Sequence, residues 1–339
     1  MNKRSSKVLA GWTMSLLLFC GHGVAFADTA TDACLAEALS TADDSTTIGE
    51  LRLLCQQGQA GRVDQTEQDE IPVYERSILD ERFDMERAAE DRPFVITAHQ
   101  PNYILWSAMD APNQAPYAGS AGVPDPLDDT EMVFQVSIKA PIWRDMFGSN
   151  IDTYFGYTAR SWWQVFNDDF SAPFRETNYQ PEVFLRSFTD REFLGAKIHF
   201  WDLGFNHESN GRTDVLSRSW NRVIGRVGLE LTDNLNVLVR TWYRLPEDDI
   251  DDDNPNEYKY YGYGDVRVGW TPNRNTFTAL LRPGTEETSY ELTWSYPISP
   301  VFRIYAQYYN GYGESLIDYD YKMERFGIGI TMNDFLGRN

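Results

Sequence analysis

The most informative pattern in the chain is an alternation of apolar and polar positions that begins near Phe94 and continues almost to the C-terminus. Segments of about ten residues alternate in this way, and clusters of Gly, Pro, Asn and Asp separate them, as in strands joined by turns. The segments are 94–106, 131–142, 151–166, 180–189, 196–209, 217–231, 234–245, 257–271, 275–283, 286–297, 301–311 and 323–335. They predict an all-β protein, an antiparallel up-and-down barrel of about twelve strands.

The links between these segments alternate in length, with long links at 107–130 and 246–256 and short ones near 232–233 and 298–300. Bacterial outer-membrane barrels have an even number of strands, short periplasmic turns and longer extracellular loops. The mean hydropathy of −0.48 resembles that of a soluble protein, but aromatic residues make up 14% of the chain and many lie near segment ends. Because aromatic girdles mark membrane interfaces, we expect a transmembrane barrel in the outer membrane of a Gram-negative bacterium.

The first 27 residues have the composition of a secretory signal peptide. Residues Met1–Lys7 are basic, Val8–Cys20 is largely apolar, and Ala25-Phe26-Ala27 provides the small residues of a cleavage site. These three features occur together in exported proteins. We therefore expect residues 1–27 to be removed on export.

Residues 28–92 are polar and acidic and lack strand patterning, although 73–90 is compatible with a helix. We interpret 28–92 as a short N-terminal periplasmic extension ahead of a barrel domain at 93–339. Its two cysteines, Cys34 and Cys55, form an isolated pair in an oxidising compartment, which favours a disulfide. A metal site is disfavoured because no histidine is nearby, and a redox pair because the spacing is not CxxC.

The net charge of −21 limits the possible partners. Nucleic-acid-binding surfaces are usually basic, so the composition disfavours a nucleic-acid partner. The acidic residues concentrate in predicted loops such as Glu247–Asp253, with the sequence EDDIDDD. A solvated loop is the preferred interpretation of this run, with a low-affinity divalent-cation site as the alternative.

One predicted hairpin, Phe205–Asn221, contains the residue types of a nucleophilic site. If its turn is centred near Asp214, His207 lies opposite Asn221 on the neighbouring strand. Side chains two positions apart share a face, so Ser209 lies on the same side of the hairpin. The pattern therefore brings together a nucleophile, a base and an amide that can orient the base.

The apolar residues Trp201, Leu203 and Phe205 share the face of the hairpin with these three polar residues. Apolar positions face lipid in a membrane barrel, so the site is expected on the outer surface, with a lipid as its substrate. The opposite face is charged, and we expect its residues to form an interior network that fills the lumen. These residues are Asp202, Glu208, Arg218, Arg222 and Arg226.

Serine is a weak nucleophile unless a neighbouring base takes its proton, and neutral histidine is the usual base. Asn221 can accept the imidazole N–H and hold the ring toward Ser209. The backbone N–H groups after Ser209, with Gly211 permitting an unusual turn, are candidate donors to an oxyanion. Oxygen atoms of Asp214 and Ser217 are of the type that binds a hard cation such as Ca²⁺.

The hairpin and three other stretches resemble the outer membrane phospholipase A family. NHESNGRTDVLSRSWNR at 206–222 resembles the family signature NHxSNGRxxxxSRSWNR, and SWWQVFNDDFSAPFRETNYQP at 161–181 is similar to a second family block. DDNPN at 252–256 and YNGYGESLIDYD at 309–320 also fit. The resemblance covers about 94–336, and it implies a twelve-stranded barrel and calcium-dependent hydrolysis of acyl esters at both glycerol positions of phospholipids and lysophospholipids. It also implies an active homodimer.

By motif, the resemblance assigns roles to single residues. His207 would be the general base, Ser209 the nucleophile, Asn221 the residue that orients His207, and the backbone N–H of Gly211 an oxyanion donor. The implied calcium ligands are the carbonyl of Arg212, Ser217, Ser171 from the partner subunit, and Asp214 in a weaker monomer-type site.

The chain departs from the family pattern at three places. Ala159 stands where the family has a glutamine on the dimer-facing strand, Ala172 replaces the serine that follows Ser171, and Leu336–Asn339 continues past the usual terminal aromatic Phe335. The first two differences bear on the strength of dimerisation, and the third on barrel assembly. The alternative function is a catalytically inert outer-membrane pore or binding barrel.

Overall fold

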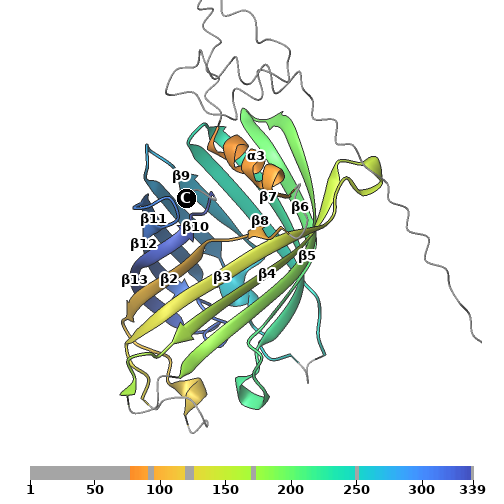
Figure 1. Ribbon diagram of the computed structural model, residues 1–339. Coiled ribbons are helices and arrows are strands. Elements are labelled where there is room, and N and C mark those ends of the chain that lie inside the picture. Colours follow the sequence, from red (N-terminus) through yellow and green to blue (C-terminus); the bar gives the residue numbers. More distant parts are fainter. Residues whose placement is uncertain (1–76, 91–94, 119–125, 169–172, 249–251, 337–339) are drawn as a thin grey trace, which may run out of the picture. The chain divides into compact units, whose positions relative to one another are not determined.

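The computed structural model describes residues 77–90, 95–118, 126–168, 173–248 and 252–336. Twelve antiparallel strands form a closed barrel, because β13 pairs with β2 and β3 pairs with both β2 and β4 (Figure 1). A short strand β1, Thr97–Ala98, adds to β3. The barrel strands are β2 Asn102–Met109, β3 Thr130–Trp143, β4 Ile151–Trp163, β5 Phe174–Phe193, β6 Ala196–Ser209, β7 Ser219–Thr232, β8 Leu235–Arg244, β9 Gly264–Trp270, β10 Thr276–Pro283, β11 Thr288–Pro297, β12 Arg303–Tyr312 and β13 Lys322–Asn333.

The alternating pattern forms strands with one apolar outer face and one polar inner face. On β6, Leu203 and Phe205 are 50% and 45% exposed on the outside, whereas Asp202 and Asn206 are buried. Such large apolar side chains are stable on an outer surface when lipid rather than water surrounds them. The predicted membrane-barrel architecture is therefore confirmed.

Strand β5 is longer than the predicted segment 180–189. Its first residues include Arg175, Glu176 and Asn178, whose side chains are buried in the lumen. Because these inward positions are polar and charged, the segment lacks the apolar periodicity of an ordinary strand. It therefore resembles a loop in sequence.

The predicted segment 257–271 contains a helical turn before its strand. Helix α4, Tyr258–Tyr261, ends at Gly262, and β9 then begins at Gly264. Gly262 has φ +62°, and a Cβ atom there would lie 2.0 Å from the carbonyl oxygen of Pro283. Only glycine satisfies both the conformation and the close approach, so the chain turns into β9 here.

Ion pairs cross the barrel lumen, largely as predicted. Arg222 lies 2.6 Å from Glu208, and Arg226 lies 3.7 Å from Asp202. Arg218 does not join this network, because it precedes β7 and donates to two carbonyls of the β6–β7 turn instead. The expectation for Arg218 was therefore wrong.

A second ionic cluster joins residues that are far apart in the sequence. Arg175, fully buried, lies 3.0 Å from Glu131 and 2.7 Å from Asp318, and Arg325 lies 3.2 Å from the other oxygen of Glu131. Buried charges are stable when each has a partner and further hydrogen bonds, which these have. The lumen of the described barrel is thus polar and crossed by ion pairs.

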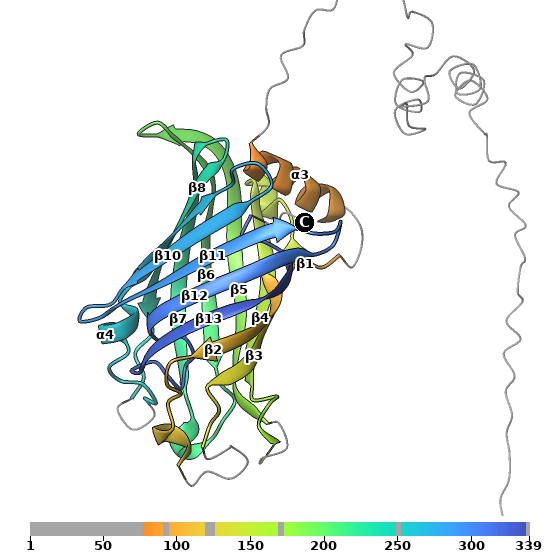
Figure 2. The ribbon, with the colours of Figure 1, turned by 90° about the vertical axis from the view of Figure 1, so that its left-hand side faces the viewer.

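Helix α3, Ile78–Glu90, packs against one end of the barrel (Figures 1 and 2). The Ser77 hydroxyl oxygen accepts a hydrogen bond from a first-turn N–H at 3.2 Å, which caps the helix start. Leu79 and Phe83, four positions apart, share one face and are buried with Phe200 and Leu336. None of the helices in the described part of the chain combines the length with the hydropathy that spanning a bilayer requires.

Charged contacts also attach α3 to the barrel. Glu86 lies 2.6 Å from Lys139 of β3, and Asp80 lies 3.1 Å from Lys197 of β6. Burial alone would raise the pKa of the Glu86 carboxyl, but the cations Arg82 and Lys139 lower that pKa to about 2. The compact unit that contains the barrel begins at Tyr74, so α3 belongs to it. The predicted signal peptide and the Cys34–Cys55 pair lie outside the described residues.

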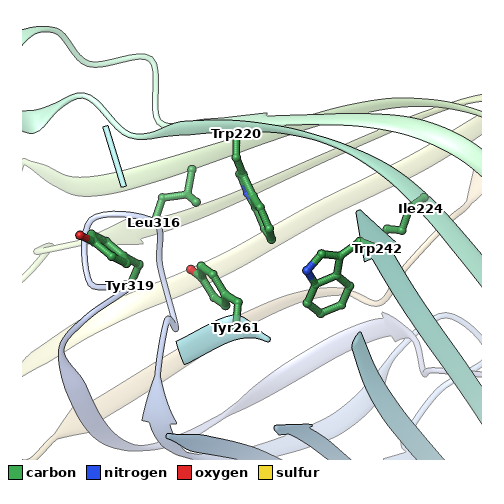
Figure 3. Packing of buried hydrophobic residues seen from close by; sticks show 6 residues of the cluster. All are labelled: Trp220, Ile224, Trp242, Tyr261, Leu316 and Tyr319. Carbon is green, nitrogen blue, oxygen red and sulfur yellow. The ribbon is translucent and has the colours of Figure 1, made fainter. Parts of the chain in front are cut away.

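An aromatic cluster supports β7 from inside the barrel (Figure 3). The rings of Trp220 and Tyr261 stack with centroids 5.2 Å apart, and Trp242 meets Trp220 edge-on at 6.1 Å. Leu316 and Tyr319 complete the cluster from the loop between β12 and β13. Since Trp220 precedes Asn221 on β7, its rigid packing holds the backbone from which Asn221 points outward.

Candidate active site on the outer face of the barrel

The β6–β7 register brings the predicted catalytic residues together. His207 pairs with Asn221 across the two strands, and Ser209 pairs with Ser219. The His207 Nδ1 and Asn221 Oδ1 atoms are 2.9 Å apart, which is a hydrogen bond. With a proton on Nδ1, the other ring nitrogen Nε2 is left as the acceptor that a general base needs.

The surroundings of this pair are apolar on the outside of the barrel. Phe205 and Val223, which pair across the strands next to His207 and Asn221, are 45% and 38% exposed. On the other side of β6, Tyr179 of β5 pairs with Ser209. A substrate that reaches Ser209 therefore meets an apolar surface continuous with the lipid-facing wall.

The turn after Ser209 is organised by Asn210, a residue that the sequence reasoning missed. Its side chain is buried and accepts hydrogen bonds from the N–H groups of Arg212 at 3.2 Å and Arg218 at 3.0 Å. It also donates to the carbonyl of Leu216 at 2.8 Å. The Asn-Gly pair in a turn was the available signal, because asparagine side chains often bond nearby backbone groups.

Gly211 has the left-handed conformation that its place after Ser209 suggested. Its φ is +65°, and a Cβ atom there would lie 3.2 Å from the Tyr179 ring. Both the conformation and the contact favour glycine. The turn consequently begins directly after Ser209, where backbone N–H groups can face a reacting carbonyl.

The predicted cation ligands lie on the far side of the same turn. Asp214 is exposed and begins the short helix η4, Asp214–Leu216, and its carbonyl accepts from the Ser217 N–H at 3.0 Å. The Ser217 hydroxyl donates to Asp253 Oδ2 at 2.6 Å. Hydroxyl and carboxylate oxygens are hard donors, so the residues present fit Ca²⁺.

Two further ligand predictions have different outcomes. The Arg212 side chain lies 3.3 Å from Glu176 and also donates to backbone carbonyls of β5, which braces the peptide unit of Arg212 against that strand. Ser171 lies outside the described residues. Within the described ranges, there is no cluster of three or more His, Cys, Asp or Glu residues arranged to hold a metal ion.

The acidic loop after β8 is attached to the site, although it was expected to be a solvated loop. The Leu245 N–H donates to the carbonyl of Asn221 at 2.7 Å, and the Asn221 side-chain amide donates to Glu247 at 3.1 Å. Asp253 contacts Ser217, as described above. The acidic composition of this loop did not indicate that Glu247 would contact Asn221 or that Asp253 would contact Ser217.

The two other histidines among the described residues, His99 and His199, lie away from Ser209. His99 pairs with Glu182 inside the barrel, and His199 lies 2.8 Å from Glu230. Each imidazole thus has a carboxylate partner away from Ser209. Arg175 and Glu176, near the predicted calcium ligands, are also buried, and their ion pairs brace the barrel.

The fold and the site together define a class: a transmembrane β-barrel with serine, histidine and asparagine side by side on its lipid-facing surface. The family model described as Phospholipase A1 matches residues 79–332. The chain belongs to this phospholipase A1 family. Phospholipase A1 of Escherichia coli strain K12 is 39% identical over 246 residues, covering 72% of this chain and 83% of that protein, and the Klebsiella pneumoniae protein is also 39% identical, with coverages of 72% and 84%.

Solved structures agree with this assignment. An active-site mutant of outer membrane phospholipase A from Escherichia coli superposes with a TM-score of 0.70 at 36% identity, covering 76% of this chain and 98% of the other. The Salmonella typhi outer membrane phospholipase, solved as a dimer with bound calcium, superposes with a TM-score of 0.68 at 36% identity, with coverages of 72% and 94%.

Proposed function

We propose that this protein is a calcium-dependent phospholipase of the Gram-negative outer membrane. It hydrolyses the acyl esters of glycerophospholipids and lysophospholipids at both glycerol positions. The observation that supports this most strongly is the His207–Asn221 hydrogen bond on the same outward face as Ser209, among exposed apolar residues. Polar residues on a lipid-facing surface are unfavourable unless they have a function.

In the proposed mechanism, the Ser209 hydroxyl oxygen attacks the ester carbonyl while His207 takes the hydroxyl proton. Asn221 keeps the imidazole in the tautomer and orientation that this transfer needs. The backbone N–H of Gly211 donates to the oxyanion that forms on the former carbonyl oxygen. His207 then gives the proton to the departing lyso-lipid oxygen, and a water molecule activated by the same histidine releases the fatty acid.

Calcium binding is proposed at the far side of the turn. The Arg212 carbonyl and the Ser217 hydroxyl would hold the ion together with Ser171 of the partner subunit, while Asp214 would bind it in the weaker monomer-type site. When bound, Ca²⁺ supplies positive charge that favours a developing oxyanion. The homodimer follows from the need for a ligand from each subunit, and the calcium-bound dimer of the Salmonella typhi relative supports it.

The domain organisation proposed from the sequence is a signal peptide at 1–27, a periplasmic extension at 28–92 with a Cys34–Cys55 disulfide, and the phospholipase barrel at 93–339. Export is required for any outer-membrane protein, which supports the first of these assignments. The last part of this extension contains α3, which packs against Phe200 of the barrel.

The test measures fatty-acid release from phosphatidylcholine in detergent micelles by the full-length protein with millimolar Ca²⁺. Activity should disappear with a chelator and return with added Ca²⁺. Ser209→Ala should abolish it, whereas the matched control Ser219→Ala, on the neighbouring strand and the same face, should retain it. Bilayer conductance without Ser209-dependent hydrolysis would instead support the inert pore.

A further inference from the structure

Glu247, in the acidic loop after β8, has a carboxylate that reaches Asn221 of the proposed active site. Its Oε1 accepts a hydrogen bond from the Asn221 side-chain amide at 3.1 Å. We infer that Glu247 is a positioning residue that fixes the Asn221 amide, and through it His207, for catalysis. This inference rests on the proposed function and adds a fourth member to its serine, histidine and asparagine arrangement.

The hydrogen-bonding capacity of the groups determines how the amide is oriented. A carboxylate only accepts hydrogen bonds, so the atom of Asn221 that faces Glu247 must be the Nδ2 donor. The other end of the amide, Oδ1, then necessarily faces His207 Nδ1 at 2.9 Å. Without Glu247, either end of the amide can face the imidazole, and the flipped form presents a donor where an acceptor is needed.

The backbone holds Glu247 in place for this contact. The Leu245 N–H donates to the Asn221 carbonyl at 2.7 Å, so the chain that leaves β8 runs beside Asn221 for two further residues. Arg244 lies 3.4 Å from the second oxygen of Glu247. Glu247 is therefore held from both sides, by Asn221 and by Arg244.

Charge provides a second reason for this arrangement. Arg244 also contacts Asp252 at 2.6 Å and Glu257 at 3.1 Å. Burial raises the pKa of Glu257 to about 8, so Glu247 and Asp252 are the two carboxylates that share the guanidinium, and the group is net negative. Asn221 itself is neutral and stabilises a protonated histidine less well than a carboxylate does. Glu247 places a negative charge one amide away, and its side chain is only 18% exposed, which limits screening by water.

This position suits a site that faces lipid. A carboxylate directly beside His207 would lie on the apolar outer wall, where an ionised side chain is costly. With asparagine in between, the charge is located in the loop beyond the strand, next to its arginine partner. The neutral amide transmits orientation from the charged group to the imidazole.

The test compares substitutions of Glu247 in two backgrounds, using fatty-acid release from phosphatidylcholine micelles with saturating Ca²⁺. In the otherwise unchanged protein, Glu247→Ala should lower kcat about tenfold and Glu247→Gln about threefold, with KM unchanged. Gln has a smaller effect because it can still accept from Asn221, although it no longer excludes the flipped amide. The neighbouring exposed Asp248→Asn is the matched control and should retain full activity.

The second background is Asn221→Asp, which sets two carboxylates against each other. There Glu247→Gln should raise kcat about tenfold, because glutamine can donate to the new carboxylate and the repulsion disappears. If Glu247 only stabilises the fold of its loop, Glu247→Gln should lower activity in both backgrounds. Only direct contact between residues 221 and 247 makes Glu247→Gln lower kcat in one background and raise it in the other.

Equal effects of Glu247→Gln in both backgrounds, or full activity of Glu247→Ala, would overturn the inference. Heat-modifiable gel migration and far-UV circular dichroism establish that each variant forms a folded barrel. If Asn221→Asp does not fold, the kcat and KM values of the Glu247→Ala and Glu247→Gln proteins decide the question. Ser209→Ala is measured alongside, since its inactivity together with unaffected Glu247 variants would refute this inference and leave the proposed function intact.

Discussion

Asn210→Ala should disable the turn that follows the nucleophile without touching the nucleophile itself. The substitution removes the two hydrogen bonds accepted from backbone N–H groups and the one donated to the Leu216 carbonyl. Each bond contributes about 1 kcal/mol net, so the ordered turn loses about 3 kcal/mol relative to its open forms. That corresponds to about a 100-fold change in the population ratio of the two.

Because the same turn positions the Gly211 N–H and the proposed calcium ligands, kcat/KM for phospholipid should fall by about tenfold to 100-fold. Half-maximal activation should also require more Ca²⁺. Asn210→Asp is a second variant that keeps the acceptor for both N–H groups. It replaces the donor to Leu216 with a carboxylate oxygen and sets that carboxylate beside Glu176, so it should also lower kcat/KM.

The assay is fatty-acid release at a series of Ca²⁺ concentrations, with far-UV circular dichroism to confirm the folded barrel. Asn210→Ala with wild-type kcat/KM and wild-type calcium dependence would show that the Asn210 side chain does not hold this turn.

Three other predictions follow from single contacts. Gly211→Ala should lower kcat about tenfold, measured by the same assay, because φ of +65° disfavours alanine by about 1–2 kcal/mol and the new methyl group lies against Tyr179. Phe83→Ala should release α3 from the barrel, since it deletes a buried ring worth about 3 kcal/mol; limited proteolysis should then cleave within 77–90, whereas the exposed Met85→Ala should not have this effect. The contribution of Glu86 to α3 docking should be complete above its ordinary pKa of 4.5 and decline as pH falls toward about 2, because the folded pKa is depressed; hydrogen exchange in α3 that does not increase over this range would contradict it.

The fold was largely predictable because membrane strands repeat one simple constraint. Every second residue faces lipid, so apolar positions such as Leu203 and Phe205 mark the outer face in the sequence alone. The rule failed at the start of β5, where Arg175 and Glu176 are buried only because distant partners neutralise or bond them. Such pairing depends on the closed barrel and has no local signature.

In the candidate site, the residues of the β6–β7 hairpin were predictable, whereas the residues that reach it from a distant loop were not. His207 and Asn221 belong to one hairpin, so strand alternation and a turn position sufficed to place them opposite each other. Glu247 and Asp253 reach the site from a loop after β8, and the sequence contains no periodicity that fixes where a loop folds back. Asn210 had a local signal in its Asn-Gly dipeptide, which predicts a turn but not its three hydrogen bonds.

For helix α3, the helix itself was predictable but its docking on the barrel was not. Its charged sequence is compatible with a helix, and the spacing of Leu79 and Phe83 was a weak indication of one apolar face. Its docking could not be predicted, because the partners Phe200, Lys139 and Lys197 come from separate strands and meet only in the closed barrel.

Covalent labelling from the lipid side tests most directly whether Ser209 is the nucleophile. The full-length protein in detergent with Ca²⁺ is incubated with a long-chain fluorophosphonate, and the modified peptide is identified by mass spectrometry. We expect a single adduct on the Ser209 oxygen that abolishes hydrolysis, and His207→Ala should greatly slow its formation. Persistent hydrolysis with Ser209 unmodified, or an inactivating adduct on another residue, would contradict it.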